Sequence, residues 1–114
     1  MPRRILVVDD EPMVLDVTAQ MLEDLGCEVL TATNAEDALR RISDDSHIEI
    51  LVTDINMPGM DGRELAARAV HIHKNLKVIV LSGSQVDGCG FPLVRKPFSQ
   101  DDLRQTMLNH TGLC

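Results

Sequence analysis

Asp54 is the side chain whose position in the sequence most clearly suggests chemistry. It follows the largely apolar run 48–53 and precedes the segment 55–62, which is rich in glycine and proline. A short apolar run is typical of a buried strand, and the punctuated segment after it is typical of a loop. Asp54 is therefore predicted where a strand becomes a loop, which is where α/β sheets place their binding sites.

Other polar side chains hold equivalent places elsewhere in the chain. Asp9 and Asp10, Ser82 and Lys96 each follow a short apolar run. The carboxyl ends of parallel strands meet at one edge of a sheet, so we expect these side chains to share one rim with Asp54.

This set of side chains predicts a specific chemistry. Three carboxylates on one rim raise one another's pKa unless a cation is present. Oxygen ligands without a neighbouring histidine or cysteine suit Mg²⁺, and a lysine with a hydroxyl is suited to hold a phosphoryl group. The sequence offers no histidine or cysteine nucleophile beside the site and no glycine-rich phosphate loop. Phosphoryl transfer through an aspartyl phosphate on Asp54 is the resulting prediction.

Strand-like and helix-like patterns alternate along the whole chain. Strands are predicted at 5–8, 28–33, 48–53, 78–81 and 93–95. Helices are predicted at 12–25, from the cap Asn34 through Ile42, at about 63–73, and after the cap Ser99. The stretch 85–92 is predicted to be mostly loop. This alternation predicts one α/β domain over residues 1–114, with a parallel sheet, helices on both faces and right-handed crossovers.

Apolar residues recur at helical spacing in the predicted helices. In the first helix they include Met13, Val17 and Met21, and the methionines are expected in the core. In the third helix the row that ends at Ile72 is expected to point inward, and in the last helix the row that ends at Leu108 is expected on one face.

Composition narrows the class of protein. With 114 residues, 44% of them hydrophobic, the chain can bury one compact core. Its net charge of −7 argues against a nucleic-acid-binding surface. No apolar stretch has the length of a membrane span and no secretory signal precedes the first strand, so a cytoplasmic protein is expected. Cys27, Cys89 and Cys114 fit neither a disulfide framework nor a zinc site and are expected to be free thiols.

Four motifs occur in a specific order and spacing. They are Val-Val-Asp-Asp-Glu-Pro at 7–12, Asp-Ile-Asn-Met-Pro-Gly-Met-Asp-Gly at 54–62, Ser-Gly at 82–83 and Lys-Pro-Phe at 96–98. With these motifs the chain resembles the receiver domain of two-component response regulators over essentially its whole length. The resemblance implies a flavodoxin-like five-stranded parallel sheet of strand order 2-1-3-4-5.

The resemblance also implies a function in a phosphorelay. Asp54 would accept a phosphoryl group from a phosphohistidine of a sensor histidine kinase or a histidine phosphotransfer protein. Asp10 and Asp54 would bind Mg²⁺ through their side chains and Asn56 through its backbone carbonyl, with Asp9 acting through a metal-bound water. Such a domain catalyses only its own phosphorylation and slow dephosphorylation.

The remaining implied roles concern the switch. Ser82 is similar to the hydroxyl that moves to the phosphoryl group, and Lys96 to the lysine that pairs with it. Gly83 leaves room beside the phosphoryl group, and the Lys96–Pro97 bond is expected to be cis. Phosphorylation would change the binding of a downstream protein, and the domain is expected to be a monomer or a weak homodimer.

Two features depart from the family pattern. Leu93 stands where a rotating tyrosine or phenylalanine is usual, and the span from Ser82 to Lys96 is shorter than usual by about two helical turns. The fourth helix is therefore expected to be reduced or missing. We hypothesise that output uses another surface, such as the first or last helix, or that the domain is a receiver of the hybrid-kinase or relay type.

Other functions remain open from the sequence. A Mg²⁺-dependent phosphatase of small phosphoesters could also use an aspartyl phosphate, although haloacid dehalogenase-type enzymes carry an acid where this chain has Asn56. A receiver that has lost phosphorylation could serve as a binding module. Taken alone, residues 9–11 could be an acidic cluster at a helix start, and Asp61 with Gly62 is interpreted as a turn that caps the third helix.

Overall fold

Strands and helices alternate in the computed structural model, which describes residues 3–83 and 90–112. The strands in these ranges are β1 (Arg4–Val8), β2 (Glu28–Ala32), β3 (Ile48–Asp54), β4 (Lys77–Ser82) and β5 (Leu93–Arg95). The helices are α1 (Pro12–Asp24), α2 (Ala35–Asp44), α3 (Gly62–Ile72) and α4 (Gln100–His110). Each lies within a few residues of its predicted position.

The strands form one parallel sheet of order β2-β1-β3-β4-β5, which confirms the predicted fold. The register pairs Val8 of β1 with Thr53 of β3, and Asp54 with Leu81 of β4. Ser82 in turn pairs with a residue of β5. The carboxyl ends of β1, β3, β4 and β5 therefore lie along one edge of the sheet.

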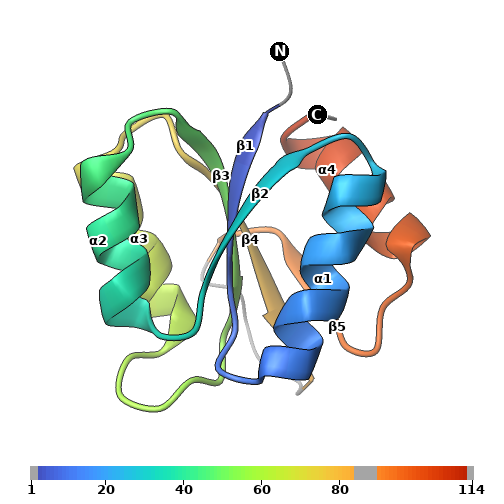
Figure 1. Cartoon of the computed structure of the whole chain (residues 1–114), viewed down its shortest axis with the longest axis horizontal. Coiled ribbons are helices and arrows are strands. Elements are labelled where there is room, and N and C mark those ends of the chain that lie inside the picture. Colours follow the sequence, from blue (N-terminus) through green and yellow to red (C-terminus); the bar gives the residue numbers. More distant parts are fainter. Residues whose placement is uncertain (1–2, 84–89, 113–114) are drawn as a thin grey trace.

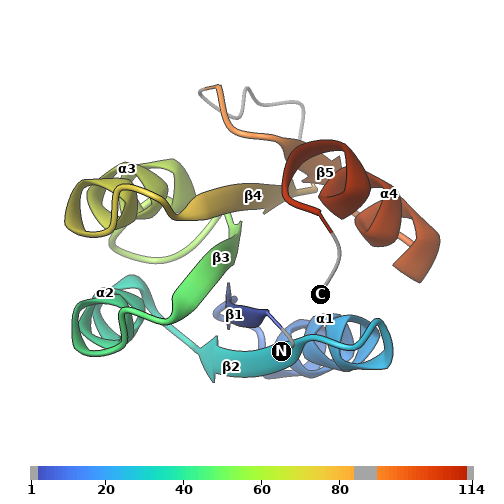
Figure 2. The same cartoon turned by 90° about the horizontal axis from the view of Figure 1, so that it is seen from above.

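Helices cover both faces of the sheet, with α2 and α3 on one face and α1 and α4 on the other (Figures 1 and 2). Alternate residues of β1 enter separate apolar clusters, Leu6 on the α2–α3 side and Ile5 on the α1–α4 side. A strand buried on both faces needs a continuous apolar run rather than an alternating one. That requirement explains why these strands were recognisable in the sequence.

The helices begin and end at residues suited to those positions. The Asn34 side chain accepts a hydrogen bond of 2.7 Å from the Asp37 amide at the start of α2. Ser99 and Asp102 form a reciprocal capping box at the start of α4. Gly26 follows α1 with a φ of +94°, a conformation that glycine adopts without a steric penalty. The predicted caps Asn34 and Ser99 are confirmed.

The prediction of which apolar side chains face the core is wrong at several positions. In α1 the buried residues are Leu15, Thr18, Ala19 and Leu22. Met13 is 83% exposed and Val17 is 55% exposed. The helix carries two apolar rows, and the one with the i, i+3, i+4, i+7 spacing that starts at Leu15 packs against the sheet. Ile72 and Leu108 are exposed too, although Met107, next to Leu108, is fully buried.

The segment between β4 and β5 contains no helix in its described part, and residues 84–89 lie outside the described residues. This agrees with the predicted reduction of the fourth helix. Leu93 is partly buried and packs against the α2–α3 cluster.

Two expectations from composition can be compared with the structure. The prediction of free thiols is wrong for Cys27, which is disulfide-bonded; Cys89 and Cys114 lie outside the described residues. Among the residues that were searched, no helix has the length and apolar character needed to cross a membrane.

The two ends of the described chain meet at the amino edge of the sheet. The Arg3 guanidinium, just before β1, donates a hydrogen bond to the carbonyl of Thr111, just after α4. Because α4 returns antiparallel to the strands, this contact lies at the opposite edge from Asp54.

Replacing Asn34 with alanine is expected to destabilise the protein by about 1 kcal/mol, because the Asp37 amide at the start of α2 loses the side chain that accepts its hydrogen bond. Thermal unfolding followed by circular dichroism should give a Tm lower by about 4 °C. Asn34→Asp is the matched control and should keep the wild-type Tm, because aspartate also caps helices. Equal Tm values for the alanine variant and the wild type would contradict the assignment.

Candidate functional site

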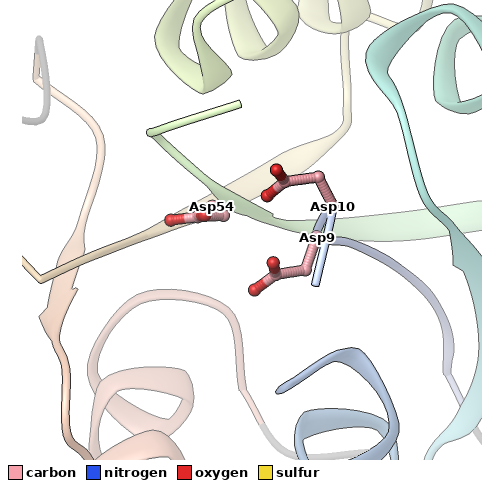
Figure 3. A group of neighbouring side chains, drawn as sticks. All are labelled: Asp9, Asp10 and Asp54. Carbon is pink, nitrogen blue, oxygen red and sulfur yellow. The ribbon is translucent and has the colours of Figure 1, made fainter. Parts of the chain in front are cut away.

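Three carboxylates converge at the carboxyl edge of the sheet (Figure 3). Asp9 and Asp10 follow β1 directly, and Asp54 is the last residue of β3. Each offers an oxygen, and these oxygens lie within 4.8 Å of one another. Asp9 is 0% exposed and Asp54 is 4% exposed, while Asp10 is more accessible. The predicted acidic rim is present.

Lys96 joins two of these acids. Its Nζ atom lies 3.2 Å from Oδ2 of Asp9 and 3.3 Å from Oδ1 of Asp54. The lysine arrives from the turn after β5, so one cation connects the ends of three strands. A single lysine neutralises only one of the three carboxylates, and the site keeps a negative field.

Burial and charge shift the pKa of both Asp54 and Lys96. Burial, with the neighbouring Asp9 carboxylate, raises the pKa of Asp54 above its ordinary value, although Lys96 and the Asn56 amide act in the other direction. Burial would lower the pKa of Lys96, but the carboxylates of Asp54 and Asp9 outweigh it and raise that pKa. Lys96 is therefore protonated at neutral pH, and Asp54 is held in a site that is short of positive charge.

The loop after β3 is closed by backbone hydrogen bonds. The Ile55 amide donates to the Leu81 carbonyl over 2.9 Å, and the Gly62 amide donates to the Ile55 carbonyl over 2.8 Å. The Asn56 amide also acts on the Asp54 carboxylate and lowers its pKa. The closed loop thus holds the backbone of Asn56 near the acidic rim, where the resemblance to receiver domains implies a metal ligand.

Ser82 and its neighbours complete the rim. Ser82 ends β4, is fully buried, and accepts the Lys96 backbone amide through its carbonyl over 2.8 Å. The Lys96–Pro97 bond is cis, as predicted. A Cβ atom at Gly83 would lie 4.0 Å from Cβ of Lys96, an ordinary contact, so space remains on this side of the site.

The donor set of the rim fits Mg²⁺. Carboxylate oxygens from three residues, with no histidine or cysteine in the group, are ligands for a hard divalent cation. Asp9 already uses one oxygen to accept the Glu11 amide and the other to contact Lys96. Asp10, the most accessible of the three acids, is therefore better placed than Asp9 for direct coordination.

An apolar groove, which is not predicted from the sequence, adjoins the rim. Its volume is about 460 Å³, and its lining residues are Met13, Val14, Val17, Thr18, Met21, Lys96, Pro97 and Phe98. Lys96 belongs to both the groove and the acidic site. Met13 and Val17 of α1 line this groove instead of the predicted core, and the surplus of apolar residues on that helix is the sequence signal for it.

Comparison with known proteins gives matches over most of the chain. A family model described as "response regulator receiver domain" matches residues 5–108. The sensor histidine kinase RcsC of Escherichia coli is 35% identical over 115 residues, which cover 90% of this chain but only 12% of RcsC. The chain thus spans a small part of the length of this relative.

Solved structures agree in fold. A CheY-like response regulator receiver domain protein from Methanospirillum hungatei has a TM-score of 0.87 at 30% identity, covering 96% of this chain and 93% of its own. The response regulator TrrA from Thermotoga maritima, in complex with Mg²⁺ and BeF, has a TM-score of 0.85 at 31% identity, covering 96% of this chain and 98% of its own.

Replacing Asp54 with asparagine is expected to raise the Tm at neutral pH without divalent cations. The folded protein holds Asp54 with a raised pKa, so its contribution to stability is complete below the ordinary value of 3.8 and is lost as the pH rises through the folded value. The advantage of the variant should therefore shrink on acidification. Thermal unfolding in EDTA across the acid range measures this difference.

Asp61→Asn is the control of opposite sign. The Arg63 side chain lowers the pKa of Asp61, so this variant should lose stability at neutral pH and converge with the wild type in acid. An Asp54→Asn protein less stable than the wild type at neutral pH would contradict the electrostatic description of the site.

Proposed function

The chain belongs to the response regulator receiver domain family, and on that basis we propose that Asp54 is the phosphoacceptor of a phosphorelay. The observation that carries the proposal is the geometry of Asp54. It is a buried carboxylate whose oxygen lies 3.3 Å from the Lys96 ammonium and within 4.8 Å of oxygens from two other acids. A carboxylate nucleophile that takes up a dianionic group needs a neighbouring cation in a partly buried site, and Lys96 supplies one such charge.

The proposed reaction transfers a phosphoryl group from a phosphohistidine to Asp54. A carboxylate oxygen of Asp54 forms a bond to phosphorus while the bond between phosphorus and the imidazole nitrogen breaks. The imidazole leaves with the electron pair of that bond, and the product is an aspartyl phosphate. Lys96 keeps Asp54 ionised before transfer and neutralises the phosphoryl oxygens afterwards.

Mg²⁺ is the proposed cofactor. Asp10 and Asp54 would hold it through carboxylate oxygens and Asn56 through its backbone carbonyl, with Asp9 acting through a water. When bound, the ion neutralises charge on the transferring group. The Mg²⁺ and BeF complex of TrrA is a property of that protein and supports the same chemistry here.

The switch is proposed to involve Ser82 and Lys96. Ser82 would donate its hydroxyl to a phosphoryl oxygen, and its position at the end of β4 beside Asp54's partner Leu81 supports this role. The Ser82 carbonyl accepts a hydrogen bond from the Lys96 backbone amide, so a movement of either residue would also displace the end of β5.

The apolar groove is the proposed docking surface for the phosphodonor, a sensor histidine kinase or a histidine phosphotransfer protein. A donor must bring its phosphohistidine to the rim, and the groove adjoins the rim through Lys96. Met13 and Val17 expose apolar surface there, which suits an apolar row of a partner helix. The match to a small part of RcsC supports a receiver of the hybrid-kinase type.

Acetyl phosphate with Mg²⁺ is expected to label the wild-type chain with one phosphoryl group per molecule, measured by intact mass. Asp54→Asn should remain unlabelled. Lys96→Ala should still bind Mg²⁺ but be labelled roughly a hundredfold more slowly, because a donor to the transferring group is lost. Release of phosphate over many turnovers would instead indicate the alternative, a Mg²⁺-dependent phosphatase of small phosphoesters.

Val17→Glu is expected to slow phosphotransfer from a phosphorylated histidine phosphotransfer protein by tenfold or more, because it places a charge in the groove. Its labelling by acetyl phosphate, which needs no docking, should match the wild type. Ile72→Glu is the matched control, since Ile72 is 47% exposed on α3 and lies outside the groove. Equal loss in both variants would contradict the proposed surface.

A further inference from the structure

Gly62, the first residue of α3, lies against the backbone of Asp54. A Cβ atom at Gly62 would lie 2.0 Å from the Asp54 carbonyl oxygen, 2.8 Å from its carbonyl carbon and 2.9 Å from Cα of Ile55. All three distances are below van der Waals contact, and all three atoms are backbone. No side-chain rotation can therefore relieve the clash.

The backbone of Asp54 is fixed from several directions. The Thr53 hydroxyl donates to the Asp54 carbonyl over 3.0 Å, and Asp54 pairs with Leu81 in the sheet. The Ile55 amide is bonded to the Leu81 carbonyl. Any shift that makes room at Gly62 must therefore move the end of β3 or the start of α3.

The start of α3 is fixed as well. The Asp61 side chain accepts the Arg63 amide over 2.7 Å as an N-cap, and Leu65 and Ala66 are fully buried in the core. The Gly62 amide itself closes the loop by donating to the Ile55 carbonyl over 2.8 Å. The helix and the strand thus meet at a contact that only a residue without a Cβ atom permits.

We propose that Gly62 is a positioning residue for the phosphoacceptor, acting by allowing the first turn of α3 to touch the Asp54 backbone. This inference rests on the proposed function of Asp54. The closed loop sets the carboxylate of Asp54 and the backbone of Asn56 in one geometry. A displacement of about 1 Å at a reacting group can cost on the order of a hundredfold in rate.

The requirement at Gly62 differs from that at Gly59 in the same loop. Gly59 has a φ of +86°, and a Cβ atom there would meet no atom within 4 Å. Alanine at Gly59 strains the local backbone but does not touch the phosphoacceptor. Alanine at Gly62 acts directly on the backbone of Asp54. The two substitutions therefore separate loop strain from displacement of the site.

The test compares Gly62→Ala, Gly62→Ser and Gly59→Ala. Two quantities are measured: the Mg²⁺ dissociation constant by calorimetry, because the chain has no tryptophan or tyrosine to report by fluorescence, and the labelling rate with acetyl phosphate at saturating Mg²⁺. Both Gly62 variants should bind Mg²⁺ at least tenfold more weakly and be labelled at least tenfold more slowly. Their losses should be equal, because the clash comes from Cβ alone. Gly59→Ala should stay within threefold of the wild type in both quantities.

Wild-type values in either Gly62 variant would overturn the proposal, as would an equal loss in Gly59→Ala. Should the Gly62 variants fail to fold, a Mg²⁺ titration of the wild type by amide NMR decides the question. The Gly62 amide should shift with the same dissociation constant as the Asn56 amide, and an unmoved Gly62 signal would overturn the proposal. A wild type that acetyl phosphate does not label refutes the function of Asp54, while this titration still reports on Gly62.

Discussion

Repulsion among three carboxylates at one edge of the sheet is the constraint on which the structure depends. Asp9 and Asp54 are buried, so water does little to screen them, and one lysine is shared between them. Separated chain segments must be held rigidly to keep like charges this close. The parallel sheet does so by ending β1, β3 and β5 at one rim, and the two apolar layers fix the strands from both faces.

Lys96 belongs both to the acidic rim and to the apolar groove beside it. Its ammonium group contacts Asp9 and Asp54, its backbone amide is bonded to Ser82, and its side chain also lines the groove against α1. A change of charge at Asp54 alters the balance of attractions on Lys96. Lys96 is therefore the side chain through which the acidic rim and the groove are in contact.

Much of the fold was predictable because its signals are local. The strand β1 is a continuous apolar run. Asn34 and Ser99 predict helix starts because their side chains accept hydrogen bonds from backbone amides of the first helical turn. The acidic rim and Lys96 followed from the rule that parallel strands end together. Their roles as metal ligands and phosphoacceptor stay predictions.

The features that sequence reasoning missed depend on distant contacts. Two apolar rows compete on α1, and only the packing of the sheet decides that Leu15 is buried while Met13 is exposed. The approach of Gly62 to Asp54 depends on how the loop closes; from the sequence it was only a turn residue. The disulfide of Cys27 is not predicted from the sequence, because three widely spaced cysteines without a CxxC pair fit neither a disulfide framework nor a zinc site.

The hydrogen bond from Arg3 to the Thr111 carbonyl joins the two ends of the described chain. This hydrogen bond holds the segments before β1 and after α4 next to each other at the edge of the sheet opposite Asp54, so the chain ends in the described ranges lie away from the acidic rim.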